Sequence, residues 1–188
     1  MLFIDYLSLL LINMVAGLAI LAFYLFKGIE EEQQGKWAAA FAIPGFIALL
    51  NGFHMIWHWP LPGSYNSAFG EPSILFGALL LGASLSLAKG WDLMPLSIYS
   101  FFAGLVAVVL GVRIIHLGMT AMPLLSGTGF ILTGLAGVFA APVLYLKKHR
   151  AIRVFAALML LITAAIWAVN GYGAYWMHMD GFTKWMPK

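Results

Sequence analysis

The histidines are the residues of this sequence most able to do chemistry, and four of the five approach the same end of the predicted helices. His54 and His58 lie one turn apart on one face of a predicted helix. His116 and His178 fall at a similar level near the ends of later apolar runs. An ionisable side chain inside hydrocarbon is costly, so several at one depth favour a functional role. We therefore expect these histidines to converge on one site.

A b-type haem near the outer leaflet is the first chemistry that this group predicts. Haem needs apolar walls, one or two imidazoles from facing helices and often a basic residue for its propionates. His54 or His58 opposite His116 would supply the imidazoles, and Arg113 lies one turn from His116. These four residues are the expected cofactor ligands of a membrane-embedded redox or ligand-binding protein.

A bare metal centre is an alternative that the same residues leave open. Methionines stand beside the histidines in His54-Met55 and Met177-His178-Met179. Thioether ligands favour Cu(I), so copper is the metal that this composition suggests. The expected ligands are His54, His58, His116, His178 and Glu71.

Two further classes of function differ in how far the sequence supports them. A non-catalytic accessory subunit of a larger membrane complex, such as a respiratory complex, would have other subunits or quinone as partners, and it stays an alternative. A channel is disfavoured because no continuous polar path is evident. The inner half of the predicted bundle offers only small hydroxyl side chains, at Ser84, Ser86, Ser97, Ser100, Thr133 and Thr163.

Composition places the chain in a membrane. Of 188 residues 63% are hydrophobic and 9% are charged, with a mean hydropathy of +0.94. An average soluble domain has about 25% charged residues, so a soluble globule is excluded. Ten basic residues against seven acidic ones are too few for a nucleic-acid surface. The absence of cysteine excludes disulfides, iron–sulfur clusters and thiolate metal sites.

The elements that must position the histidines are apolar runs bounded by charge, proline or glycine. Each run is long enough, or nearly so, to cross a hydrocarbon core about 30 Å thick. We expect a single all-α integral membrane domain over residues 1–188, a bundle of six transmembrane helices. The runs are 5–26, 37–59, 73–88, 94–117, 124–146 and 152–177.

Basic residues predict the orientation of the bundle. Seven of the ten Lys and Arg residues fall in the first, third and fifth loops, and three lie on the opposite side. By the positive-inside rule, both termini lie outside a cytoplasmic (inner) membrane.

A weak internal repeat relates the second, fourth and sixth predicted helices. Segments beginning at Gly45, Gly104 and Ala164 align with offsets of 59 and 60 residues, and each carries a glycine seven positions later. This pattern predicts three helical hairpins around a pseudo-threefold axis along the membrane normal.

The loop between the second and third helices carries a family resemblance. The stretch from Trp59 to Pro72, together with Lys89-Gly90-Trp91-Asp92, resembles an uncharacterised family of small bacterial and archaeal integral membrane proteins, a domain of unknown function. The resemblance covers most of the chain. It implies a shared fold and assigns no mechanism and no catalytic residue.

Overall fold

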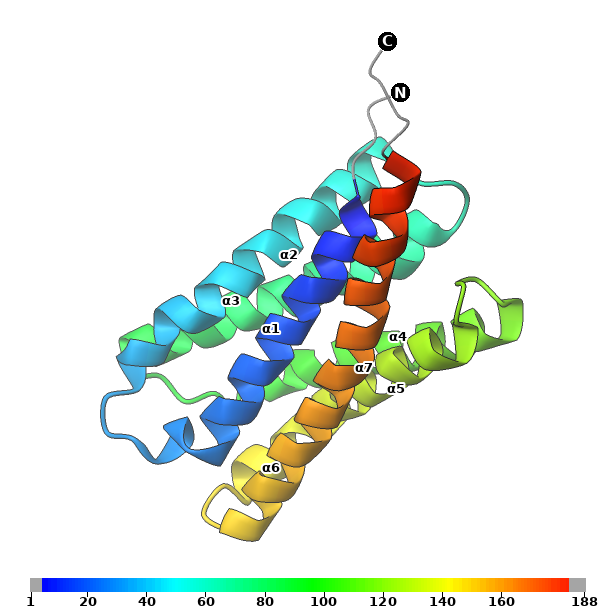
Figure 1. Ribbon diagram of the computed structural model, residues 1–188. Helices are drawn as coiled ribbons and strands as arrows, with labels where there is room; N and C mark the ends of the chain where they lie inside the picture. The colour runs from blue at the N-terminus through cyan, green and yellow to red at the C-terminus, as the bar shows by residue number, and fades with distance from the viewer. Residues whose placement is uncertain (1–4, 183–188) are drawn as a thin grey trace.

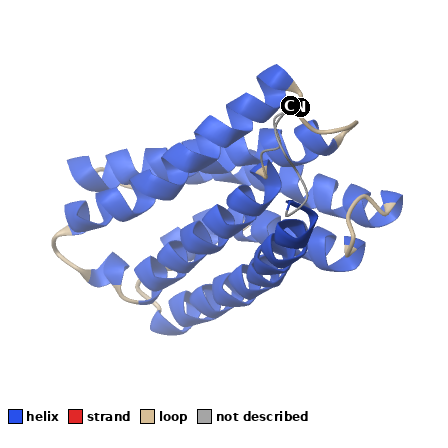
Figure 2. Ribbon diagram, turned by 45° about the horizontal axis from the view of Figure 1, so that its top comes forward, coloured by secondary structure: helices blue, strands red, loops and turns tan. Residues whose placement is uncertain are grey.

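The computed structural model describes residues 5–182 and is built from helices throughout that range (Figures 1 and 2). The helices are α1 (Tyr6–Phe26), α2 (Ala38–His58), α3 (Glu71–Lys89), α4 (Leu96–Leu117), α5 (Pro123–Val138), α6 (Ala140–Tyr145) and α7 (Arg150–Phe182). Two short 3₁₀ turns, η1 (Gly28–Glu30) and η2 (Gln34–Trp37), join α1 to α2, and a π turn, η3 (Asn66–Gly70), precedes α3. Within residues 5–182, five helices are long and apolar enough to cross a membrane: α1, α2, α3, α4 and α7. The chain is an all-helical integral membrane protein.

The predicted run over 124–146 is divided in the structure. Helix α5 ends at Val138 and α6 begins at Ala140, with Phe139 between them. Pro142 is the physical cause, because its ring clashes with the carbonyl four residues earlier, at Val138, and it has no N–H to donate. A proline read only as part of an apolar run therefore breaks that run into two helices.

The long helices close into a ring. Helix α1 packs against α2 and α7, α3 packs against α2 and α4, and α5 packs against α4 and α7. The most extensive contacts join α2 to α3, α4 to α5, and α1 to α7, whose ribbons run side by side in Figure 1. The first turn of α1 and the last turns of α7 lie at the same end of the bundle, where Asp5 contacts His178. A ring of this kind surrounds a central space.

Glycines allow the tightest pairs of helices to approach. A Cβ atom added to Gly111 of α4 would lie 2.6 Å from the carbonyl oxygen of Gly127 on α5. A Cβ atom added to Gly77 of α3 would lie 2.7 Å from the carbonyl oxygen of Gly45 on α2. Such distances exclude any side chain, so these glycines bring the helix backbones into contact, as small residues do in membrane bundles.

The connection between α2 and α3 is held by specific hydrogen bonds. Trp59 ends α2 in the left-handed conformation, with φ at 46°. The side chain of Asn66 is fully buried, accepts the Leu61 N–H at 3.0 Å and donates to the Leu61 carbonyl at 2.5 Å. The Tyr65 hydroxyl donates to the carbonyl of Met119, beyond the end of α4. The loop is therefore fastened to itself and to the neighbouring α4–α5 connection.

Candidate functional site

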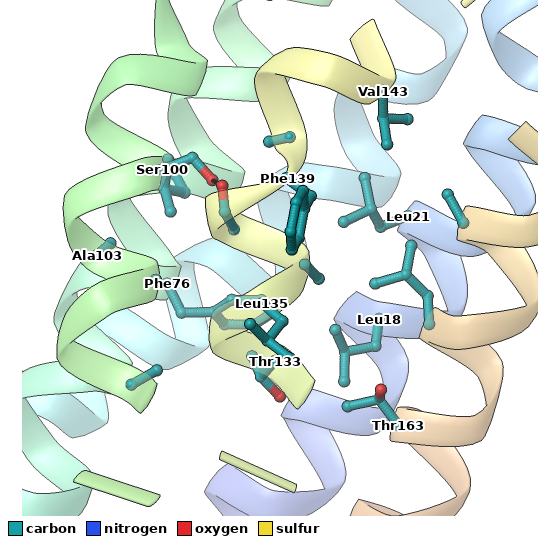
Figure 3. A pocket seen from close by; sticks show the side chains of 18 of the residues that line it. Leu18, Leu21, Phe76, Ser100, Ala103, Thr133, Leu135, Phe139, Val143 and Thr163 are labelled. Atoms are coloured by element: carbon teal, nitrogen blue, oxygen red, sulfur yellow. Dashed lines mark hydrogen bonds between the residues drawn. The ribbon is translucent and has the colours of Figure 1, made fainter. Parts of the chain in front are cut away.

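A cavity of about 430 Å³ lies inside the ring of helices, and all seven helices contribute to its wall (Figure 3). Most of the lining is aliphatic or aromatic, as Leu18, Phe76, Leu135 and Phe139 illustrate. None of the described residues that line it carries a charge. The cavity is therefore a predominantly apolar, uncharged chamber in the centre of a membrane bundle.

A small set of polar side chains interrupts this apolar wall. The hydroxyls come from three helices around the cavity: Ser97 and Ser100 from α4, Thr133 from α5 and Thr163 from α7. Figure 3 shows Ser100, Thr133 and Thr163 among the lining side chains. The remaining polar members are Tyr24 of α1 and Trp167 of α7.

An aromatic cluster lies at one end of this wall. The Trp167 side chain is 2% exposed, and its ring meets Phe130 edge-on with ring centroids 5.1 Å apart. Phe130 in turn meets Phe69 of η3 edge-on at 5.3 Å. Edge-to-face contacts of this geometry stabilise aromatic packing. The three rings connect η3, α5 and α7 across the interior of the bundle.

Beyond this cluster, buried polar side chains continue toward the α4–α5 loop. The Trp167 indole donates to the Thr133 hydroxyl at 2.9 Å, and Asn170 lies one turn further along α7. The Ser126 hydroxyl donates to Asn170 Oδ1 at 2.9 Å, and the Thr120 hydroxyl donates to Ser126 at 3.0 Å. Sequence analysis missed this series because its members stand singly on different segments and become neighbours only in the ring.

The predicted histidines form separate local pairs. His54 Nε2 lies 2.8 Å from the Tyr6 hydroxyl, and the two rings stack. His58 stacks on His54 with ring centroids 4.3 Å apart, as the one-turn spacing predicted. His178 Nδ1 lies 2.7 Å from an Asp5 carboxylate oxygen and 3.3 Å from the Ser8 hydroxyl.

The other predicted site residues are at the surface. Arg113 Nη1 lies 2.7 Å from His116 Nδ1, so these two side chains on α4 contact each other, and both residues are exposed. Glu71 is the exposed first residue of α3, where a carboxylate stabilises the positive end of the helix dipole. Within residues 5–182 the structure assembles no group of three or more His, Asp or Glu side chains that could hold a metal ion.

A second polar cluster closes the end of the bundle near η1 and η2. Glu31 accepts hydrogen bonds from the Trp37 indole at 2.7 Å and pairs with Lys36 at 2.9 Å. These bonds, that of Lys36 first, lower the pKa of the Glu31 carboxyl. Arg153 of α7 is only 1% exposed and pairs with the carboxylate of Glu30. In the sequence Glu30 and Glu31 belong to a run of three acidic residues, and nothing in that run reveals that the distant Arg153 is buried beside it.

The fold matches a solved membrane channel. The cryo-electron microscopy structure of the Helicobacter pylori urea channel in its closed state aligns with a TM-score of 0.73 and 19% sequence identity. The alignment covers 92% of this chain and 98% of the channel chain. No curated protein sequence matches the chain significantly.

These findings correct the predicted function. The fold is similar to that of a urea channel, and the described residues hold no group of His, Asp or Glu suited to a metal, so the prediction of a haem or metal redox protein is wrong. The histidine spacing was read correctly on the face of α2, but a shared helix face does not determine which other helices it meets.

The resemblance in the α2–α3 loop is confirmed by a family model that matches residues 1–181. The chain belongs to the family described as protein of unknown function DUF981.

Proposed function

We propose that this protein is a membrane channel for small uncharged solutes, and that the central cavity is part of the path. The observation that carries the proposal is an uncharged cavity of about 430 Å³ that is lined by side chains from every α-helix between residues 5 and 182. Ligand sites of known proteins have volumes of about 300–1,000 Å³. The likeness in fold to a urea channel supports the same class of function.

The chemistry of the lining favours neutral solutes over ions. An ion that enters a low-dielectric chamber loses its hydration, and a lining without charges offers nothing of equal strength in return. A small neutral solute has a much lower desolvation cost and can use the few hydroxyls of the wall. The lining therefore fits a solute such as urea better than it fits a metal ion or a proton.

The aromatic cluster of Phe69, Phe130 and Trp167 is the proposed barrier along the path. Its rings pack edge to face, and Trp167 is almost fully buried. Passage between the cavity and the buried polar series at Ser126 and Asn170 then requires these rings to move. Rearrangements of packed side chains gate the passage of small molecules in many proteins.

We further propose six crossings, with α5 and α6 together forming the fifth, arranged as three similar units. Two glycine contacts support this arrangement between α2 and the continuous segment η3–α3, and two more support it between α4 and α5. In each pair, the two contacts are seven residues apart along both segments. They are Gly45–Gly77 with Gly52–Gly70, and Gly104–Gly134 with Gly111–Gly127. Gly171 of α7 packs against α1 in a corresponding place.

The flux of urea into vesicles tests the channel. Purified protein is reconstituted into liposomes, and urea entry is followed by stopped-flow light scattering against protein-free vesicles. Ala156→Phe places a ring in the cavity wall, whereas Ala165→Phe places the same ring on the exposed face of the same helix. We expect faster urea entry with the protein, lost in the first variant and kept in the second. Entry no faster than in protein-free vesicles, with the helical circular dichroism intact, would refute the channel.

Orientation is tested by single cysteines in the cysteine-free chain. With both termini outside a cytoplasmic membrane, Ser64→Cys lies outside and Lys148→Cys lies inside, and both positions are exposed. An impermeant maleimide applied to whole cells should label the first variant directly and the second only after permeabilisation. The reverse order of labelling would invert the topology.

A further inference from the structure

We infer that the cavity selects solutes that donate hydrogen bonds, because its polar side chains present acceptors and no available donors. This inference rests on the proposed channel function and specifies the class of solute. It follows from where each polar hydrogen of the lining already goes.

The hydroxyl hydrogens of the wall are engaged by helix carbonyls. A hydroxyl carries one hydrogen and two lone pairs. Ser100 donates its hydrogen to the Gly137 carbonyl at 3.1 Å, and Thr163 donates to the Met159 carbonyl at 2.8 Å. Thr133 and Ser97 donate in the same way, to the carbonyls of Gly129 at 2.8 Å and Met94 at 2.6 Å. Each hydroxyl oxygen therefore has only lone pairs left to offer.

The two other polar side chains of the lining have also used their hydrogens. The Tyr24 hydroxyl donates to Gln34 Oε1 at 2.9 Å. The Trp167 indole, which can only donate, is bonded to the Thr133 oxygen at 2.9 Å. With the hydroxyls, this accounts for every side-chain N–H and O–H group among the described lining residues.

The hydroxyl oxygens of the lining are buried, which strengthens the preference for solutes that donate hydrogen bonds. Thr163 is 1% exposed and Ser97 is 4% exposed, so water competes little for their oxygens. A solute that leaves water for the cavity must replace its lost hydrogen bonds or bear the cost of leaving them unmade. Its N–H groups can find the oxygens of Ser100, Thr133 and Thr163, while its carbonyl finds no free donor. Sites that match polar groups discriminate strongly against molecules that lack them.

Three isomeric amides isolate the number of donors from size. Propanamide, N-methylacetamide and N,N-dimethylformamide share one formula and one carbonyl, and have two, one and no N–H groups. Their entry into the proteoliposomes is measured with the rate of protein-free vesicles subtracted. We expect protein-dependent entry to fall about three- to tenfold for each N–H group removed, the effect of one net hydrogen bond.

A variant of Thr163 connects the preference to the wall. Thr163→Val keeps the shape of the side chain and removes the oxygen, so it should reduce propanamide entry toward that of N,N-dimethylformamide and leave the latter unchanged. Thr163→Ser should restore the preference. Ser73→Ala is the matched control, because Ser73 is buried and donates to the Phe69 carbonyl at 2.6 Å but does not line the cavity.

The outcomes separate the two proposals. Equal protein-dependent entry of the three isomers, with urea still conducted, would overturn the donor preference and leave the channel standing. A preference unchanged by Thr163→Val and by Ser100→Ala would remove the hydroxyl wall as its cause. Entry of neither urea nor any isomer above the protein-free rate would refute the channel itself.

Discussion

Trp167 and Thr133 are joined by a hydrogen bond of 2.9 Å from the indole nitrogen to the hydroxyl oxygen, which ties α7 to α5 at the wall of the central cavity. The same hydroxyl donates its hydrogen to the Gly129 carbonyl. One lone pair of its oxygen therefore accepts from the indole, and the other is left to accept from a solute in the cavity. Because an indole N–H can only donate and Trp167 is almost fully buried, this oxygen fixes the orientation of the ring.

Removing either partner of this hydrogen bond should lower the stability of the protein. Thr133→Val leaves a buried indole N–H without an acceptor, which costs about 1–3 kcal/mol. Trp167→Phe loses the donor as well as some ring volume. The double variant should be less destabilised than the two single effects added together, by about 1 kcal/mol, because the unpaired N–H is gone. Unfolding midpoints in detergent, followed by circular dichroism, measure all four proteins, and strictly additive losses would contradict this coupling.

The contact of α4 with α5 depends on glycine. A Cβ atom at Gly111 would lie 2.6 Å from the Gly127 carbonyl oxygen, so Gly111→Ala should force the helices apart and destabilise the protein by about 1–3 kcal/mol. Gly173→Ala on α7 is the matched control, since a Cβ atom there meets nothing within 4 Å. It should be neutral or stabilise by up to about 1 kcal/mol through helix propensity. Thermal unfolding in detergent compares the two, and equal effects would show that the close approach is not needed.

Apolar length alone predicted most of the helices, because lipid requires each crossing to satisfy its own backbone hydrogen bonds. The ends of α1, α2 and α4 fall within two residues of the predicted runs. The break at Phe139 was missed because Pro142 was treated as one apolar residue and not as the loss of a donor. Local composition gives the length of a span, while the local backbone chemistry decides whether it is continuous.

The candidate site was harder to predict because its residues are ordinary. Thr133, Thr163 and Ser100 have no motif, and each satisfies its hydrogen on a carbonyl, which is also how such residues behave in helices without any function. Their importance comes from the ring closure that places them around one cavity. The histidines stood out because ionisable groups are costly in lipid, yet His54 meets Tyr6, and His116 meets Arg113 on its own helix. Spacing along one helix cannot supply a contact between helices.

The loop between α1 and α2 should loosen in acid. Bonds from Lys36 and Trp37 lower the pKa of Glu31, so its carboxylate stabilises the folded loop above the ordinary glutamate pKa of about 4.3. That contribution is lost as the pH falls through the lowered pKa, because the protonated carboxyl no longer pairs with Lys36. Glu31→Gln should therefore flatten the acid side of the stability profile, measured as the unfolding midpoint between neutral and strongly acidic pH. The exposed neighbour Glu32→Gln is the control, and an acid limb identical in all three proteins would contradict the assignment.

The buried guanidinium of Arg153 predicts how stability should respond when its partner, Glu30, is removed. Its side chain is 1% exposed, it pairs with Glu30 through Nη2, and its Nε and Nη1 groups are buried without a partner among residues 5–182. Glu30→Gln removes the balancing charge and leaves the arginine buried, which should destabilise the protein. The loss should be below the roughly 3–5 kcal/mol of a fully buried broken pair, because the Glu30 side chain is 63% exposed.

Replacing Arg153 with an apolar residue should destabilise the protein less than removing its partner, Glu30. Arg153→Met removes the buried charge and its two unpaired N–H groups, so we expect it to cost less than Glu30→Gln. The double variant should then be no less stable than Arg153→Met alone, because Glu30 has no buried partner left to balance. Arg150→Met, at the exposed start of the same helix, controls for the loss of a positive charge and should change the unfolding midpoint little. If Arg153→Met proved the most damaging of these changes, the guanidinium would be contributing bonds that exceed its desolvation cost, and the single bond to Glu30 would not account for its burial.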